Sequence, residues 1–314
     1  MLEKLFHLKE NNTTVKTEIL AGITSFMTMA YILAVNPSIL AAAGMDQGAV
    51  FTATALASLL GTLCMALFAN YPFALAPGMG LNAYFAYTVV IGMGYSWQTA
   101  LTAVFVEGVI FIILSVTNVR EAIFNAIPAN LKVAVSVGIG LFIAFIGLQN
   151  AKIVIGGSTL VQLFSVAKYN EVNGVNATFN DVGITVLLAI IGVIITAILV
   201  VKNVKGNILW GILITWVLGI ICQLTGVYVP NAELGFYNLL PDFSNGISIP
   251  SLAPVFCKMD FSGILSLNFI VVIFSFLFVD LFDTIGTLIG VSSKAGMLLS
   301  LIHISEPTRP EPIS

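Results

Sequence analysis

Long apolar runs alternate with short polar segments along the 314 residues of the chain. Crossing a bilayer as an α-helix takes roughly 20 predominantly apolar residues, which is about the length of each run. The pattern therefore predicts an all-α polytopic membrane protein with about eight spans. The predicted spans are Ile19–Leu40, Val50–Ala69, Pro72–Ile91, Ala100–Val116, Leu131–Leu148, Val182–Val201, Ile208–Val229 and Leu265–Val291.

The third predicted span is interrupted by Pro77, Gly78 and Gly80, which are followed by Asn82. Proline removes a backbone donor and glycine weakens a helix, so we expect the backbone to break there. At membrane depth, broken backbone is tolerated only inside protein or beside a cavity. We therefore predict a discontinuous binding segment that includes Asn82. A proline kink absorbed by helix packing is the alternative.

The composition agrees with a membrane protein. Hydrophobic residues make up 58% of the chain and charged residues 9%, and the mean hydropathy is +1.03. The two histidines, His7 and His303, lie outside the predicted spans, and the three cysteines show no metal-ligand spacing. We therefore expect neither a metal site nor histidine chemistry inside the membrane.

Lysine and arginine are unevenly distributed between the two sides of the predicted topology. If the amino terminus is cytoplasmic, the inner segments hold eight of these residues and the outer segments hold three. This excess follows the positive-inside rule, so we predict a cytoplasmic amino terminus. The membrane expected for this multi-pass protein is the plasma (cell inner) membrane. The inner residues are Lys4, Lys9, Lys16, Arg120, Lys132, Lys202, Lys205 and Lys294, and the outer ones are Lys152, Lys168 and Lys258.

The last predicted span carries two carboxylates, Asp280 and Asp283, within an apolar segment. A charge at such depth costs roughly 3 kcal/mol or more, so it is normally paired, protonated or beside water. The two residues are three apart and share one face of a helix, which Thr284 and Thr287 extend. The arrangement favours the binding of an ion or a polar substrate.

Two further polar side chains lie within predicted spans. Glu107 is a third intramembrane carboxylate, either protonated and buried or paired with a polar group on another span. Thr28 lies one turn after Thr24 and on the same stripe as Tyr31, which makes it a candidate ligand. The alternative for Thr28 is a hydrogen bond to its own backbone.

Three separated motifs resemble those of a known transporter family. They are Gly22–Pro37 (GITSFMTMAYILAVNP), Ala76–Phe85 (APGMGLNAYF) and Phe278–Thr287 (FVDLFDTIGT). In this order they resemble the hypoxanthine/guanine/adenine permease branch of the xanthine–uracil permeases, which are nucleobase–cation symporters. The resemblance covers about residues 5–297. It implies a fold of fourteen spans, built as two inverted repeats of seven with a core and a gate domain.

Within that fold, residues 1–118 are expected to form core spans one to four, and residues 119–262 gate spans five to seven. Residues 263–298 are expected to open the second repeat with span eight of the core domain. On this interpretation the chain is a C-terminally truncated fragment. Residues 299–314 look like a translated sequencing-adaptor fragment and are interpreted as a non-native tail, the alternative being a genuine disordered cytoplasmic tail.

The resemblance also implies roles for individual residues. Asn82 matches the polar position of the broken third span, Asp280 the substrate-binding carboxylate of the eighth span, and Asp283 its neighbour one turn on. The implied substrate is a purine nucleobase such as adenine, guanine or hypoxanthine, whose N–H groups suit a carboxylate acceptor. The predicted substrate site comprises Asp280, Asn82, Asp283, Thr284, Thr287, Thr28 and Phe85, and the predicted proton-coupling residues are Asp280, Asp283 and Glu107.

Neighbouring carboxylates in a low-dielectric site hold protons more tightly. We therefore expect purine uptake by H⁺ symport rather than Na⁺ symport, without a cofactor. The expected partners are the purine base and membrane lipid, a homodimer is a further option, and nucleic acid is not expected.

Other functions stay open. An anion or other small-solute transporter of the same fold is one, although it would place helix N-termini at the ligand and avoid two acids beside it. A cation channel would show an open polar stripe instead of a broken span. An enzyme is not expected, because the spans contain no His pair, Ser/Lys pair or His-Glu-x-x-His pattern. A non-functional truncated product is the last alternative.

Overall fold

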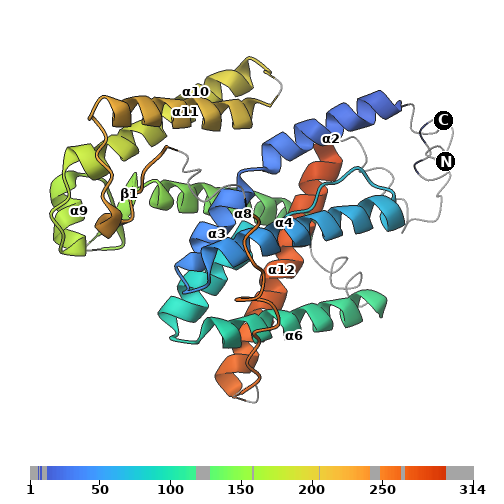
Figure 1. Ribbon diagram of the computed structural model, residues 1–314. Helices are drawn as coiled ribbons and strands as arrows, with labels where there is room; N and C mark the ends of the chain where they lie inside the picture. Colours follow the sequence, from blue (N-terminus) through green and yellow to red (C-terminus); the bar gives the residue numbers. More distant parts are fainter. Residues whose placement is uncertain are drawn as a thin grey trace. The chain divides into compact units, whose positions relative to one another are not determined.

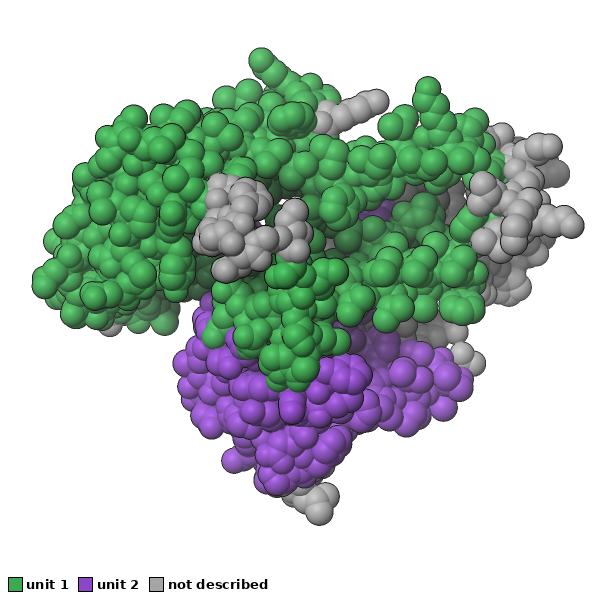
Figure 2. All heavy atoms as spheres, viewed as in Figure 1, with its two compact units in different colours: residues 1–41, 46–77, 144–255 green, residues 42–45, 78–143, 256–314 purple. Residues whose placement is uncertain are grey.

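The computed structural model describes residues 6, 8, 13–117, 128–157, 159–204, 206–240, 248–262 and 266–294. These residues are mostly helical, as Figure 1 shows. They divide into two compact units, which Figure 2 distinguishes by colour. Unit 1 comprises residues 1–41, 46–77 and 144–255, and unit 2 comprises residues 42–45, 78–143 and 256–314.

Helix α8 (Ala129–Asn150) begins in unit 2 and ends in unit 1. The other elements of unit 2 are α5 (Met79–Ala83), η2 (Tyr84–Gly92), α6 (Trp97–Val116) and α12 (Leu267–Lys294). The other elements of unit 1 are α2 (Val15–Met29), α3 (Ile32–Ala41), α4 (Gln47–Cys64), η1 (Met65–Ala69), β1 (Val154–Gly156), β2 (Val161–Leu163), α9 (Val166–Asn173), η3 (Phe179–Gly183), α10 (Ile184–Val201), α11 (Asn207–Leu224) and η4 (Ala232–Leu234).

Each of the eight predicted spans overlaps a helical segment of the described chain, although the third, Pro72–Ile91, is helical only from Met79 onward. Two of these segments are Met79–Gly92, an apolar helix shorter than a full span, and α8, of which Gly140–Asn150 is an apolar stretch. The other six are long and apolar enough to cross a membrane, so the prediction of a helical multi-pass membrane protein is confirmed. These six are Val15–Ala41, Gln47–Ala69, Trp97–Val116, Phe179–Val201, Asn207–Leu224 and Leu267–Thr284.

The first predicted span consists of two helices and not one. A turn separates α2 from α3, and in it the N–H of Leu33 donates to the carbonyl of Ala30 at 3.2 Å. Hydrogen bonds between residues three apart tighten the chain relative to an α-helix. The apolar pattern could not show this turn, because the residues that form it, Ala30 and Tyr31, are as apolar as their helical neighbours.

The chain leaves the second predicted span through a π-helical turn, η1, and then through Asn70 in the left-handed region with φ of 53°. The following residues are extended and run back beside α4. There Thr62 Oγ1 accepts a hydrogen bond from the N–H of Leu75 at 3.0 Å and donates one to its carbonyl at 3.3 Å. The hydroxyl thus supplies partners for backbone that lies outside any helix.

A helical hairpin of α10 and α11 occupies one end of unit 1 (Figure 1). Gly192 of α10 lies against Thr215 of α11, and Gly211 of α11 lies against Thr196 of α10. A Cβ atom added at Gly192 would be 2.5 Å from Thr215 Oγ1. The two helices therefore approach closely because each offers a glycine to a threonine of the other.

A small folded cap adjoins this hairpin and consists of β1, β2, α9 and η3, which lie between α8 and α10 in the chain. Its strands β1 and β2 are antiparallel, with Val154 opposite Leu163. The side chain of Asn170 accepts from the N–H of Ala177 at 2.7 Å and donates to its carbonyl at 2.9 Å. Polar side chains here satisfy backbone groups, so a polar segment can fold around a small apolar cluster. The buried members of that cluster are Ile155, Tyr169, Ala177 and Val182.

Unit 2 is built around α12, which packs against α6 and α5. The ring of Phe276 on α12 meets the edge of Tyr84 with centroids 5.1 Å apart. Near the beginning of α12, Phe269 meets Tyr95 with centroids 6.5 Å apart. One aromatic contact therefore holds α12 against η2, and a second holds it against the loop that follows η2.

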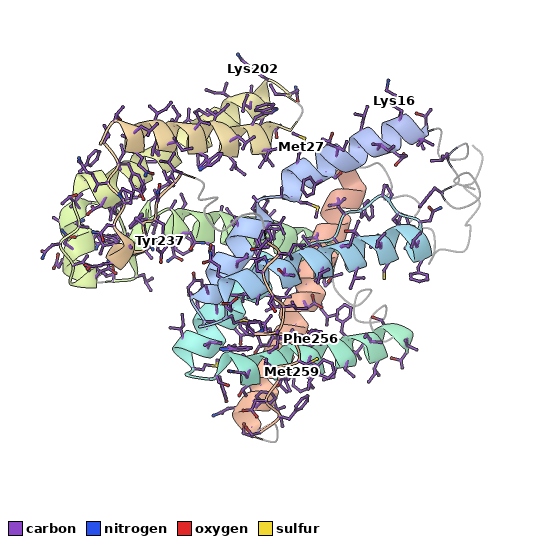
Figure 3. The ribbon with its side chains drawn as sticks, in the orientation of Figure 1. Lys16, Met27, Lys202, Tyr237, Phe256 and Met259 are labelled. Carbon is purple, nitrogen blue, oxygen red and sulfur yellow. The ribbon has the colours of Figure 1, made fainter. Side chains whose placement is uncertain are left out.

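Residues 256–262 lie along the beginning of α6, and Figure 3 labels Phe256 and Met259 in this segment. Thr102 Oγ1 donates to the carbonyl of Asp260 at 2.8 Å. The backbone N–H of Ser262 donates to Asp260 Oδ1 at 2.9 Å, and this bond together with one from the Ser262 side chain lowers the pKa of Asp260. The segment is therefore anchored at the end of α6 where that helix begins.

The predicted tail, residues 299–314, lies outside the described residues. So does the predicted boundary between the first core and gate parts at residues 118–119. The fourteen-span repeat and its division into core and gate domains stay predictions.

Candidate substrate site

The third predicted span becomes helical only at Met79, after the extended residue Gly78 with φ of −70° and ψ of 121°. From there it runs through α5 and the π-helix η2 to Gly92. The non-helical part of the predicted span therefore runs from Pro72 to Gly78, and its helical part begins at Met79. This break leaves the N-terminus of an apolar half-helix inside the fold, where three or four backbone N–H groups have no partner within the helix itself.

The carboxylate of Asp283 lies directly against this break. A Cβ atom added at Gly78 would be 2.7 Å from Asp283 Oδ2, closer than real Cβ atoms come to any neighbour. Glycine at this position thus makes room for the acid. A carboxylate beside a helix N-terminus is stabilised by the partial positive charge of that end.

The break and the acid pair lie at comparable positions along two packed elements of unit 2. Asp280 follows the first residue of α12, Leu267, by as many residues as separate Met79 from Gly92. At 1.5 Å per α-helical residue, Asp280 is about 20 Å along α12 from its start, near which Phe269 contacts Tyr95. A bilayer core is about 30 Å thick, so a residue at that distance along a spanning helix is far from both of its ends.

Asn82 lies on the first turn of the half-helix, where its backbone N–H donates to the carbonyl of Gly78 at 3.2 Å. Its side chain is half-buried, like those of Asp280 and Asp283. Phe85, one turn further, is only 4% exposed, so its ring is packed inside unit 2. The structure therefore brings Asn82 and both aspartates onto the two packed elements α5 and α12.

The predicted threonine ligands differ in their surroundings. Thr284 is half-buried, whereas Thr287 is exposed and donates to the carbonyls of Asp283 and Thr284 at 2.7 and 3.3 Å. Thr28 belongs to unit 1 and donates to the carbonyl of Ser25 at 2.7 Å. The hydroxyls of Thr287 and Thr28 thus donate to backbone carbonyls of their own helices. For Thr28 this is the alternative stated in the sequence analysis.

Glu107 on α6 is 5% exposed, and its Oε1 accepts no hydrogen bond from any described residue. Its electrostatic neighbour is Asp280 on α12. The sequence left open whether Glu107 is protonated and buried or paired with a polar group on another span, and it did not name such a group. The structure supplies that neighbour, and it is a second acid.

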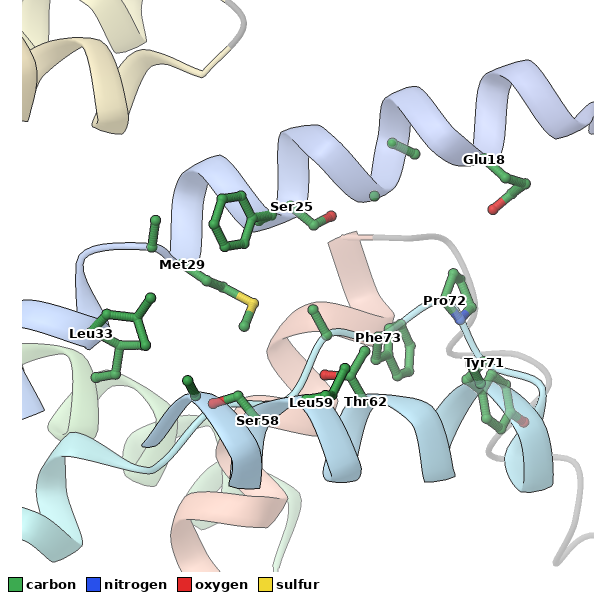
Figure 4. A pocket seen from close by; sticks show the side chains of 18 residues that line it. Glu18, Ser25, Met29, Leu33, Ser58, Leu59, Thr62, Tyr71, Pro72 and Phe73 are labelled. Atoms are coloured by element: carbon green, nitrogen blue, oxygen red, sulfur yellow. The ribbon is translucent and has the colours of Figure 1, made fainter. Parts of the chain in front are cut away.

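The sequence did not identify a cavity of about 450 Å³ in unit 1, lined by α2, α4 and residues 71–74 (Figure 4). Most of its lining is apolar, and its hydroxyl groups come from Ser25, Ser58, Thr62 and Tyr71. None of the predicted substrate residues lines it. We therefore place the candidate site at the break in unit 2. No three His, Cys, Asp or Glu side chains in the described part of the chain are arranged to hold a metal ion.

Comparison with known proteins gives the family. The family model described as "Permease family", that of the xanthine/uracil permeases, matches residues 16–305. Guanine/hypoxanthine permease PbuO of Bacillus subtilis is 45% identical over 94% of this chain and 63% of its own length. Guanine/hypoxanthine permease PbuG of the same organism is 45% identical over 95% of this chain and 64% of its own length. Adenine permease AdeP of Escherichia coli is 41% identical over 95% of this chain and 60% of its own length.

The chain thus spans about three fifths of the length of these curated relatives. Permeases are transporters, so the match confirms the prediction that the protein is not an enzyme. It also confirms the resemblance carried by the three sequence motifs. The chain belongs to the xanthine/uracil permease family.

Proposed function

We propose that this protein takes up purine nucleobases across the cell membrane by proton symport, and that α5 and α12 carry the base. The observation that supports this most directly is the contact between the broken span and the acid pair. Asp283 Oδ2 lies against Gly78. Asn82 lies four residues after Gly78, on the first turn of the half-helix, and Asp280 lies three residues before Asp283, on the same face of α12.

Purine chemistry fits these side chains. Adenine, guanine and hypoxanthine are flat and neutral and carry N–H donors next to ring acceptors. A carboxylate accepts from such donors, and an amide such as Asn82 both accepts and donates. The names of the relatives, which are guanine/hypoxanthine and adenine permeases, support the same substrate class.

An anion substrate fits less well. The N-terminus of a half-helix is a general anion-binding position. In this chain the carboxylate of Asp283 already lies beside that end, at Gly78. A second anion there would meet a like charge, so a neutral ligand is favoured.

The remaining parts of the proposal follow from the family and the charge pattern. The fold is a fourteen-span inverted repeat in which the described helices form the first repeat and the opening span of the second. The amino terminus is cytoplasmic, as the lysine distribution suggests. Protons couple the transport, since intramembrane acids are the groups that commonly carry them.

The test is uptake of radiolabelled adenine, guanine and hypoxanthine by cells that lack their own purine permeases and express the complete gene. We expect saturable uptake that unlabelled purines inhibit and that uracil and sulfate do not. Uptake should be faster at an outer pH of 6 than at pH 8, collapse with a protonophore and ignore the replacement of sodium. Uptake of sulfate, or no uptake above an empty vector at normal expression, would overturn the substrate. A sodium requirement without proton movement would overturn the coupling ion.

A further inference from the structure

Glu107 lies on the buried face of α6, in the middle of the helix. The buried residues of α6 are Ala100, Thr102, Ala103 and Glu107, and three of them, Ala100, Ala103 and Glu107, share one stripe at helical spacing. The elements that pack against α6 are α12 and η2. Glu107 is therefore an acid in a helix interface, about 15 Å from the start of α6 at Trp97.

The unmet hydrogen-bonding capacity of Glu107 calls for an explanation. Buried polar atoms in native proteins are almost always hydrogen-bonded, yet Glu107 Oε1 has no partner among the described residues. The nearby Thr102 hydroxyl donates instead to the carbonyls of Gln98 and Asp260, at 3.0 and 2.8 Å. An ionised carboxylate in this position would be costly, because no described side chain compensates its charge.

The helix of Glu107, α6, packs against α12, and Asp280 lies at a distance along α12 similar to that of Glu107 along α6. Asp280 is also the electrostatic neighbour of Glu107, and the two carboxylates have the same sign. Two ionised carboxylates that interact repel each other, whereas one proton between them turns repulsion into a hydrogen bond from a carboxylic acid to a carboxylate. Such charge-assisted bonds are short and strong. A single shared proton would therefore resolve both the burial of Glu107 and its repulsion from Asp280.

Among the side chains that the structure describes, the other titratable groups on elements packed against α6 have other surroundings. Asp283 on α12 is placed at the break beside Gly78. Tyr84 and Tyr87 lie on η2. In the segment 256–262, Lys258 is exposed and the carboxylate of Asp260 accepts from Ser262.

We propose that Glu107 and Asp280 share one proton, and that Glu107 is the member that stores it while Asp280 accepts an N–H of the base. The proposal rests on the proposed function, proton-coupled purine uptake. The proton comes from water on the outer side and forms the O–H bond of the acid pair. That bond breaks on the inner side, where the proton returns to water as the base leaves, and no bond is made to the base itself.

The test is Glu107→Gln in the transporter expressed from its complete gene. Glutamine keeps the size and hydrogen bonds of the neutral acid but cannot release a proton. We expect purine counterflow, the exchange of internal unlabelled base for external labelled base, to stay within about twofold of the parent. Net uptake should lose its pH dependence, with a ratio between pH 6 and pH 8 of about one, and should ignore a protonophore. Glu107→Asp should restore part of the pH dependence.

Glu233→Gln is the matched control, because Glu233 is an exposed acid of η4, and it should behave like the parent. A parental pH profile in Glu107→Gln with purine uptake intact would overturn the inference and leave the proposed function standing. An absence of purine uptake by the parent itself would overturn the proposed function.

If Glu107→Gln does not reach the membrane, the parent is treated with dicyclohexylcarbodiimide, which modifies protonated carboxylic acids in apolar surroundings. Labelling of Glu107 that decreases as pH rises supports the inference. No labelling of Glu107 under conditions that label another intramembrane acid contradicts it.

Discussion

The carboxylate of Asp283 occupies the space that a side chain at Gly78 would need, since an added Cβ would be 2.7 Å from Oδ2. These two residues are far apart in the sequence and belong to the broken third span and to the acidic span α12. Their contact places an acid at the positive end of a half-helix. It connects the two features that the sequence marks as costly in a membrane, a broken backbone and intramembrane carboxylates.

Replacing Gly78 with alanine should weaken purine binding more than it weakens folding. The atom that must move is the end of the Asp283 side chain, which can rotate away from the break. Overpacking typically costs about 1–3 kcal/mol. We expect most of this free energy to be lost from purine binding and not from folding, which gives a roughly tenfold loss of affinity. Calorimetry with purified protein measures the affinity, and a melting curve in detergent measures the stability.

Gly108→Ala is the control for this change, because Gly108 is a glycine of α6 with no atom within 4 Å of an added Cβ. Alanine there should leave affinity unchanged. Parental affinity in Gly78→Ala would show that the position of the Asp283 carboxylate does not matter for binding.

Asn82→Ala should lower purine affinity by roughly tenfold to a hundredfold. The amide is half-buried on the first turn of the half-helix, and losing a hydrogen bond at a desolvated site costs about 1–3 kcal/mol. The measurement is the concentration of each purine that half-saturates uptake. If affinity is unchanged and only the amount of protein in the membrane falls, Asn82 is a packing residue and the proline-kink alternative holds.

Gly192→Ala should destabilise the hairpin of α10 and α11. The added methyl would be 2.5 Å from Thr215 Oγ1 and 2.9 Å from Thr215 Cγ2, so the helices must separate, at about 1–3 kcal/mol. We expect a lower melting temperature in detergent. Thr215→Ala, which removes both of those atoms, should restore most of the loss when combined with it.

Gly140→Ala is the matched control for the hairpin, because an added Cβ there meets nothing within 4 Å. It should not lower the melting temperature. Equal melting temperatures for Gly192→Ala and the parent would mean that the two helices do not depend on this close approach.

The sequence predicted the features that depend on local composition. Apolar runs predicted the helices, and Pro77 with Gly78 predicted the break. Both predictions depend only on residues that are close together in the sequence. The turn between α2 and α3 was missed, since Ala30 and Tyr31 fit a helix or a turn equally well. The sequence did not predict the folded cap, because contacts such as the two hydrogen bonds between Asn170 and Ala177 cannot be read from composition.

The partners of the candidate site were beyond the sequence for a different reason. The neighbour of Glu107 and the contact of Gly78 both lie on α12, which is far along the chain. Periodicity shows which residues share a face of one helix, but it does not show which helix that face meets. The family resemblance supplied Asp280, Asp283 and Asn82 as site residues, and the packing of α5 against α12 gives them a common location.

The most direct test of the account is purine binding by the Asp280→Asn variant. The variant and the Glu233→Gln control are expressed from the complete gene and purified, and binding by each is measured by calorimetry. Asparagine keeps the shape of aspartate but removes the charge that accepts the N–H groups of the base. We predict that Asp280→Asn reaches the membrane, elutes as a single species and shows no measurable binding of adenine, guanine or hypoxanthine, while Glu233→Gln binds like the parent. Binding by Asp280→Asn within about threefold of the parent, which is less than 1 kcal/mol, would contradict the assignment of α12 as the substrate-binding helix.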